Sequence, residues 1–159
     1  MESSKSPELR VAFGHYATGI TIVTARGPAG EPVGMTANSF TSLSLDPPLL
    51  LWSIARRSSN FEAFQSAPGF AVHVLHDGQQ SLAQAFSARD VDRFKGIETR
   101  TGRCGAPLLG DFHACFECET YARHEGGDHL IIVGRVVSME QRAGSPLLFY
   151  RGRFTSLGG

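Results

Sequence analysis

Hydrophobic and polar positions alternate along much of the chain at the spacing of β-strands. Runs rich in valine, isoleucine and aromatic residues recur at short intervals, and we expect strands at 20–25, 49–54, 69–76, 112–121, 129–139 and 147–154. Only three stretches carry the period of a helix, one starting at Ser6, one at 60–66 and one at 79–87. The pattern predicts a mainly β protein with a few short flanking helices.

The stretch 34–51 stands out because it follows neither a helical nor a strand period. Small and hydroxyl-bearing residues fill it up to an Asp-Pro-Pro corner at 46–48. Short side chains keep a backbone approachable and offer hydrogen-bonding groups to a flat polar ligand. The segment is therefore either a ligand site or a polar edge strand followed by a loop, and its residues alone leave both interpretations open.

A second candidate site follows the strand expected at 49–54. Ser59 and Glu62 have the spacing of a capping box, so the next helix is expected to begin at Ser59. Two arginines at 56–57 and the Ser58 hydroxyl precede this helix start. A basic, hydroxyl-bearing loop beside free backbone N–H groups is suited to bind phosphate. The alternative is an ordinary capped helix with solvated arginines.

Two later segments read as connections between strands. Residues 97–109 are rich in Gly, Thr and Pro without a period, so we expect a loop or lid there. The paired glycines of 122–128 predict a turn between two strands. Asp128 and His129 stand at the mouth of that turn, where a histidine beside a carboxylate can orient a ligand or a proton. An exposed turn histidine is the other interpretation.

Charge and composition narrow the classes of function. Fifteen Lys and Arg balance fifteen Asp and Glu, so no overall field draws the chain to nucleic acid or to an anionic membrane. No run reaches the length of a membrane span, and the N-terminal residues lack a secretory signal. We expect no nucleic-acid partner, no membrane attachment and a cytoplasmic location. The length suits a single domain over 1–159, with a disordered N-terminus at 1–6.

The three cysteines, Cys104, Cys115 and Cys118, are an odd number and are expected to be reduced thiols. Cys115 and Cys118 form a C-x-x-C pattern, which raises the possibility of a zinc site or a redox dithiol. On a strand, however, residues three apart point to opposite faces. We therefore expect packing cysteines and no metal. His73 alternates with apolar residues and is expected to be packed in the interior.

Strands at short intervals favour a closed or partly closed antiparallel barrel over an alternating βαβ sheet. The glycine-rich dinucleotide fingerprint, the Walker loop and the G-x-S-x-G elbow are all missing from the sequence. A nucleotide, if bound, would not sit on a Rossmann unit.

Several motifs together resemble one known family. They are GHYATGITIVT at 14–24, GMTANSFTSLSLDPPLL at 34–50, RSSNF at 57–61, Arg93-Phe94, Gly127-Asp128-His129 and the terminal YRGRF at 150–154. This combination, in order over nearly the whole chain, resembles the short-chain NAD(P)H:flavin oxidoreductases, the reductase components of two-component flavin-dependent monooxygenases. The resemblance implies an FMN-binding split β-barrel, antiparallel and of Greek-key type, that forms a homodimer.

The resemblance also implies roles for individual positions. Backbone and side-chain groups of 36–39 would contact the flavin ring, Ser42 would lie near the ribityl chain, and the loop after residue 52 would cradle the phosphate. The implied cofactor-binding residues are Thr36, Ala37, Asn38, Ser39, Ser42, Ser53, Ala55, Arg57, Ser58, Ser59, Phe94, Gly127, Tyr150 and Phe154. His129 and Asp128 are the implied catalytic pair on the nicotinamide side. Relatives often carry Asn-Arg before the serines, whereas this chain has Ala55-Arg56-Arg57.

The expected reaction is reduction of FMN or FAD by NADH or NADPH, with hydride passing from nicotinamide C4 to flavin N5. Reduced flavin would then reach a partner monooxygenase, by contact or by diffusion alone. Two alternatives stay open. One is a flavoprotein on the same barrel whose prosthetic flavin reduces another acceptor, and the other is a non-catalytic flavin-binding protein.

Overall fold

The structure, a computed structural model, describes residues 6–158. In chain order its elements are α1 (Ser6–Phe13), β1 (Thr18–Gly19), β2 (Thr21–Arg26), β3 (Pro32–Ala37), β4 (Thr41–Leu45), β5 (Pro48–Ala55), α2 (Phe61–Ser66), β6 (Gly69–Val74), the 3₁₀ turn η2 (Asp77–Gln79), α3 (Gln80–Ala85), β7 (Thr99–Thr101), β8 (Pro107–Leu109), β9 (Ala114–Gly126), β10 (His129–Gln141), β11 (Leu147–Tyr150) and β12 (Arg153–Ser156). The expected disordered stretch at 1–6 lies outside the described residues except for Ser6, which opens α1.

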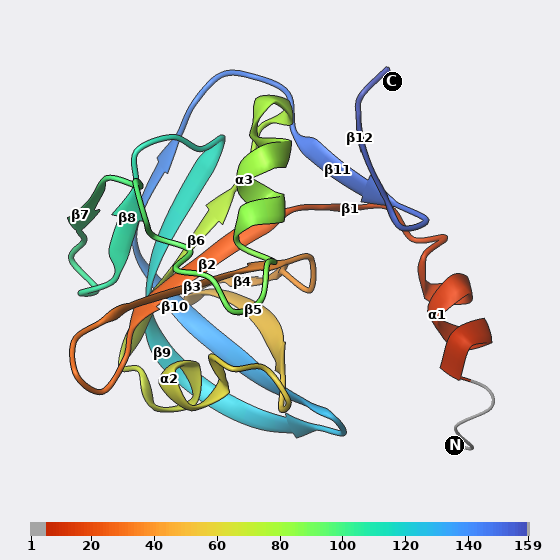
Figure 1. Ribbon diagram of the computed structural model, residues 1–159. Coiled ribbons are helices and arrows are strands. Elements are labelled where there is room, and N and C mark those ends of the chain that lie inside the picture. Colours follow the sequence, from red (N-terminus) through yellow and green to blue (C-terminus); the bar gives the residue numbers. More distant parts are fainter. Residues whose placement is uncertain (1–5, 159) are drawn as a thin grey trace.

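One curved antiparallel sheet forms the body of the molecule (Figure 1). Its seven strands follow the order β3-β2-β6-β9-β10-β5-β4, and each neighbouring pair is antiparallel. Two smaller sheets, β1-β11-β12 and β7-β8, lie against it. The predicted mainly β, antiparallel architecture with a few short helices is confirmed.

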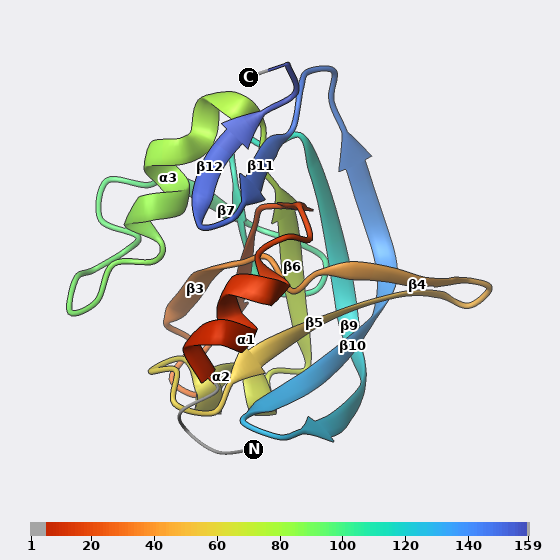
Figure 2. The ribbon, with the colours of Figure 1, turned by 90° about the vertical axis from the view of Figure 1, so that its right-hand side faces the viewer.

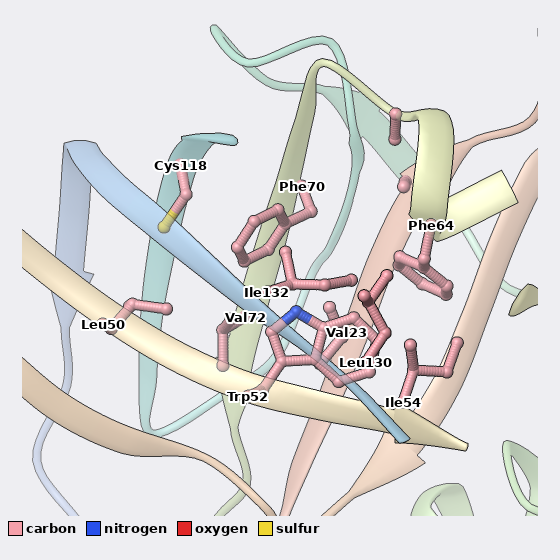
Figure 3. Close-up of a cluster of buried hydrophobic side chains, with 12 residues drawn as sticks. Val23, Leu50, Trp52, Ile54, Phe64, Phe70, Val72, Cys118, Leu130 and Ile132 are labelled. Atoms are coloured by element: carbon pink, nitrogen blue, oxygen red, sulfur yellow. The ribbon is translucent and has the colours of Figure 1, made fainter. Parts of the chain in front are cut away.

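A cluster of buried side chains fills the inside of the curved sheet (Figure 3). The ring of Trp52 meets Phe64 of α2 edge-on, with the ring centroids 4.9 Å apart. Alternation along β5 places Leu50, Trp52 and Ile54 inward, while their neighbours are half-buried. The short helix α2 therefore closes one end of this core, because it supplies an aromatic side chain to it.

Strand β2 is buried on both faces, which explains its continuous run of apolar and threonine residues. Val23 belongs to the core inside the main sheet. Ile22 belongs to a second cluster, which also contains Leu75, before α3, and Phe86, directly after it. The Thr24 hydroxyl donates to the carbonyl of Pro107 at 2.6 Å. A strand between two cores shows no polar face.

Of the two interpretations left open for 34–51, the polar edge strand agrees with the local structure, although strand rather than loop follows it. The segment contains the end of β3, all of β4 and the first half of β5; β3 and β4 are the two edge strands of the main sheet. Edge strands have one solvent-facing side, so small polar residues are tolerated along them. Figure 2 shows the β4–β5 hairpin extending away from the body of the molecule.

Three other boundaries differ from expectation because hairpins are tighter than the sequence pattern indicates. The expected loop at 97–109 contains the small hairpin β7–β8. The expected turn at 122–128 is mostly strand, and only residues 127–128 turn, with Gly127 at φ +68°. The expected single strand at 147–154 is the hairpin β11–β12, with a turn at Arg151 and Gly152, both at positive φ. Left-handed residues allow the reversals at 127–128 and 151–152 within two positions, whereas the β7–β8 hairpin turns over residues 102–106.

His73 is packed in the interior, as predicted, and both of its ring nitrogens are satisfied. Its Nδ1–H donates to the carbonyl of Ile22 at 3.0 Å, and the N–H of Leu109 donates to Nε2 at 3.1 Å. This arrangement fits only the neutral ring, since the imidazolium has no acceptor. Burial lowers the pKa of His73 from 6.5 to about 4, although the Ile22 carbonyl and Glu117 oppose that shift.

His73 should therefore make the protein less stable in acid. Below pH 6.5 the unfolded chain takes up a proton at His73, while the folded chain stays neutral down to about pH 4. The free energy of unfolding should fall by about 1.4 kcal/mol per pH unit from this residue across that window, and not above it. Urea unfolding of wild type and His73→Gln measures the difference. Equal pH dependence in the two proteins contradicts the assignment; His124→Gln, at an exposed position, is the control.

Candidate active site

A pocket of about 680 Å³ opens between three segments that lie far apart in the sequence. The first wall is the start of β3, the second is the loop between β5 and α2, and the third is the segment after α3. The lining residues are Pro32, Val33, Gly34, Ala55, Arg57, Ser58, Ser59, Asn60, Ser87, Ala88, Arg89, Asp90, Val91, Asp92, Arg93 and Phe94. Its volume is in the range of small-molecule sites.

The second wall contains most of the residues expected to hold a phosphate. Ala55, Arg57, Ser58 and Ser59 all line the pocket. The predicted capping box is wrong: α2 starts at Phe61, and no side chain caps it. Instead the Ser58 hydroxyl accepts from the N–H of Asn60 at 3.2 Å, and the Ser58 N–H donates to the carbonyl of Ala55. These local bonds form a tight turn that presents hydroxyls to the pocket.

The carbonyl oxygen of Gly34 is the point at which all three walls meet. Asn60 of the second wall donates its side-chain N–H to it at 3.4 Å, and Arg93 of the third wall donates Nη1–H at 2.8 Å. A Cβ at position 34 would come within 2.9 Å of Phe86 and 3.0 Å of Phe94. Glycine is required here because two aromatic rings pack directly on the backbone.

The third wall, residues 87–94, contains pocket residues that the sequence did not single out. Arg89, Asp90, Val91 and Asp92 line the pocket, and Asp90 adopts a left-handed φ of 58°. The signal was present as a charged, non-periodic run directly after a helix. Phe94, which was expected, packs edge-on against Phe86 with ring centroids 5.1 Å apart.

Asp128 and His129 lie beside the second wall because β10 pairs with β5. His129 stands opposite Ala55 in the ladder, and the N–H of Arg56 donates to the carbonyl of Asp128 at 2.9 Å. Arg56 also pairs with Glu125 on β9. The strand register thus brings residues more than seventy positions apart next to each other at the edge of the pocket.

The two side chains of this pair interact directly. His129 Nδ1–H donates to Asp128 Oδ1 at 2.7 Å, since an ionised carboxylate can only accept. This hydrogen bond lowers the pKa of the Asp128 carboxyl, and the positive charge of Arg57 adds to the effect. About half of the His129 side chain is exposed, and among the described residues its Nε2 atom has no hydrogen-bond partner. A histidine held by a carboxylate has a fixed tautomer and orientation.

Most of the residues expected around a flavin ring form hydrogen bonds within the protein. The Thr36 hydroxyl donates to the carbonyl of Ala83 at 2.6 Å, and the Ala37 carbonyl accepts from the Thr21 hydroxyl. Ser39 Oγ donates to the carbonyl of Ser53 and accepts from its N–H. None of these four implied positions lines the pocket.

Asn38 is different, because its side chain is exposed. Ser42 is also exposed and stands opposite Leu50 on edge strand β4, away from the pocket lining.

Tyr150 and Phe154 lie in the small sheet that contains β11 and β12, outside the pocket lining. Phe154 packs against Phe149 with ring centroids 5.3 Å apart, whereas Tyr150 is exposed. The structure thus brings five of the implied contact residues into one pocket lining, Ala55, Arg57, Ser58, Ser59 and Phe94.

The C-x-x-C cysteines point into different parts of the interior, as the strand alternation predicted. Cys118 lies in the core inside the main sheet and Cys115 in a separate cluster with Phe112. All three cysteines are free thiols. Burial raises the pKa of Cys115 to about 12 and raises that of Cys118 as well. Thiols of this kind are unreactive at neutral pH.

The protein is a mainly β protein whose pocket combines guanidinium groups, hydroxyls and an aromatic ring beside an oriented histidine, a set of groups suited to an anionic, nucleotide-like ligand. Comparison with known proteins gives the family. Residues 13–158 match the family described as "Flavin reductase like domain", so the chain belongs to that family. The resemblance to a flavin reductase family seen in the sequence is confirmed.

Relatives and solved structures agree with this assignment. A protein from Rhizobium meliloti named "Probable flavin reductase" is 47% identical over 92% of this chain, which spans only 47% of that relative. "FMN reductase (NADH) SmoA" of Agrobacterium fabrum is 46% identical over 96% of this chain and 86% of its own length. The Streptomyces globisporus "NADH:FAD oxidoreductase SgcE6 in complex with NAD and FAD fragments" superposes with a TM-score of 0.90 at 39% identity, covering 98% of this chain and 94% of that one.

Within residues 6–158, no helix combines the length and the apolar character that crossing a membrane requires.

Proposed function

We propose that this chain reduces a flavin nucleotide with NADH or NADPH and supplies the reduced flavin to a separate oxygenase. The observation that carries the proposal is the juxtaposition of two groups: Arg57, Ser58 and Ser59 line a pocket, and the β5–β10 register places His129 opposite Ala55 at its edge. One group suits the phosphate of a flavin nucleotide, and the other suits a nicotinamide.

The phosphate end of a flavin nucleotide fits the chemistry of the second wall. Arg57 and Arg89 line the pocket, are exposed and form no ion pair within the described residues. Ser58 and Ser59 directly follow Arg57 in the sequence, and both line the pocket. Charged hydrogen bonds from guanidinium to phosphate are among the strongest that proteins make.

The edge of β3 offers the groups that would hold the ring. Backbone groups of alternate residues on an edge strand face away from the sheet. The Gly34 carbonyl and the Thr36 N–H already use this row, bonding Arg93 and Phe86 respectively. Asn38 is next in the row and has a free side-chain amide, so we infer that it donates to and accepts from the ring edge.

A flavin bound here supplies the electron-pair acceptor for hydride from the nicotinamide, and the chain's own residues need only bind and orient. Asp128 fixes the ring of His129, and His129 Nε2 then contacts the carboxamide side of the nicotinamide. No nucleophile or acid–base pair is required of the protein.

Oxidation of NADH and NADPH followed by absorbance, with FMN, FAD, riboflavin or no flavin added, tests the proposal. We expect turnover that requires added flavin and saturates with it. Turnover without added flavin in protein that keeps its flavin through dialysis would favour a prosthetic flavin and another acceptor. Flavin binding without turnover would favour a flavin-binding protein without catalysis.

His129→Ala should raise the KM for the nicotinamide nucleotide about five- to tenfold, the value of one hydrogen bond, and leave flavin affinity within about twofold. Steady-state kinetics and flavin fluorescence titration measure the two effects. His124→Ala, an exposed histidine on the same hairpin, is the matched control and should change neither. If His129→Ala weakened nicotinamide nucleotide use and flavin binding equally, the assignment of His129 to the nicotinamide would be wrong.

We infer that the main sheet is a split β-barrel within one domain and that two copies form a homodimer. The short connection 38–40 supports closure, since it joins β3 and β4, the two edge strands of the sheet; within it Ser39 bonds Ser53 of β5. Exposed apolar residues support a dimer: Leu43 and Leu45 lie on the β4 hairpin, and Phe13 lies on α1, which has no buried residue (Figure 2). Exposed apolar patches of this kind mark association surfaces.

Replacing both Leu43 and Leu45 with Asp should convert the dimer to monomers, because each charge would be buried without a partner in the interface. Sedimentation velocity measures the mass. Leu157→Asp, at an exposed leucine outside the β4 hairpin and α1, is the control and should remain dimeric. A wild-type monomer, or a dimer that survives the double substitution, would contradict this surface.

The partner we propose is a flavin-dependent monooxygenase. One relative, from Acinetobacter baylyi, is named "Flavin-dependent trigonelline monooxygenase, reductase component", and another, from Rhodococcus jostii, is named "Flavin-dependent monooxygenase, reductase subunit HsaB".

The location we propose is the cytoplasm, where NADH and NADPH are made. The three free thiols are in keeping with that reducing compartment.

A further inference from the structure

The third wall of the pocket, residues 87–94, is not part of any sheet, so a few side-chain bonds fix its position. Arg93 provides the main ones. Its Nε–H donates to the carbonyl of Ala88 at 3.0 Å, within the wall, and its Nη1–H donates to the carbonyl of Gly34 at 2.8 Å, on β3. One guanidinium therefore shapes the wall and attaches it to the sheet.

Arg93 differs from the other two arginines of the pocket. It is half-buried, whereas Arg57 and Arg89 are exposed. Partial burial lowers the pKa of Arg93 from its ordinary value without removing its charge at neutral pH. Because two of its donors are already bonded to backbone carbonyls, its geometry is that of a clamp between chain segments.

The clamp decides where Phe94 lies. The carboxylate of Asp92 accepts from the Phe94 N–H at 3.1 Å, and the Phe94 ring packs edge-on against Phe86. Both rings rest on Gly34, whose carbonyl is the atom that Arg93 holds. If this bond were lost, the wall would separate from β3 and the pocket would widen at its phosphate end.

We propose that Arg93 is a positioning residue that sets the affinity for the phosphate-bearing part of the flavin nucleotide by holding the 87–94 wall against Gly34. This inference rests on the proposed function, since it assumes that the flavin nucleotide enters this pocket. The ring lies against the edge of β3 and is less affected. Arg93 thereby increases the affinity for flavin nucleotides relative to riboflavin, which has no phosphate.

Lysine cannot take over this role. A guanidinium presents several N–H donors in a rigid plane and can bond two carbonyls in fixed directions, whereas an ammonium on a flexible stem cannot reproduce both bonds. Arg93→Lys keeps the positive charge and removes the clamp. A phosphate ligand, by contrast, would still be attracted by the lysine charge.

The experiment compares the Kd of wild type, Arg93→Lys and Arg93→Ala for FMN, FAD and riboflavin by fluorescence titration without nicotinamide nucleotide. Both variants should bind FMN and FAD about tenfold more weakly, and riboflavin within about twofold of wild type. Phe94→Leu loosens the same wall without touching the guanidinium and should give the same pattern. Riboflavin binding also shows that each variant is folded.

Arg142→Lys is the matched control. The Arg142 guanidinium also bonds a backbone carbonyl, that of Gly110 at 2.9 Å, and stacks over Phe112, outside this pocket. It should leave all three Kd values unchanged. Wild-type affinity for FMN in Arg93→Lys, or equal losses for FMN and riboflavin, would overturn the clamp. Failure of wild type to bind any flavin would instead overturn the proposed function, and this inference with it.

Discussion

The ladder between β5 and β10 is the constraint on which both the core and the site depend. Its register runs from His129 opposite Ala55 to Arg135 opposite Leu49. The same register turns Trp52 into the core, where Phe64 meets its ring. A slip of one residue would exchange the two faces of the strand. The burial of one large aromatic side chain therefore fixes the position of the proposed nicotinamide-side histidine.

Gly34 has the corresponding role for the pocket. Hydrogen bonds from Asn60 and Arg93 converge on its carbonyl, and Phe86 and Phe94 occupy the space that a side chain would need. An edge strand has outward-facing carbonyls without sheet partners. In this fold they serve as attachment points for the loops that line the pocket, so the polar edge strand forms part of the candidate site.

The groups at the site are consistent with a reaction in which the protein binds and orients its ligands and supplies no nucleophile or acid–base pair. Hydroxyls and guanidinium groups line the pocket, and one oriented histidine lies beside it. Cys115, Cys118 and His73 are buried away from it. Binding and orientation of two ligands are what such a set of groups can provide. This agrees with the flavin reductase-like family to which the chain belongs.

Local pattern determined the strands, the packed His73 and the opposed faces of Cys115 and Cys118, because period and burial are encoded within a few residues. The phosphate-binding candidates at 55–59 were also found from the sequence, although the capping box was not formed. Only the tertiary structure placed the 87–94 wall on Gly34 and His129 beside Ala55. Such contacts join distant segments through backbone carbonyls and strand register, and neither has a signature in the amino-acid types.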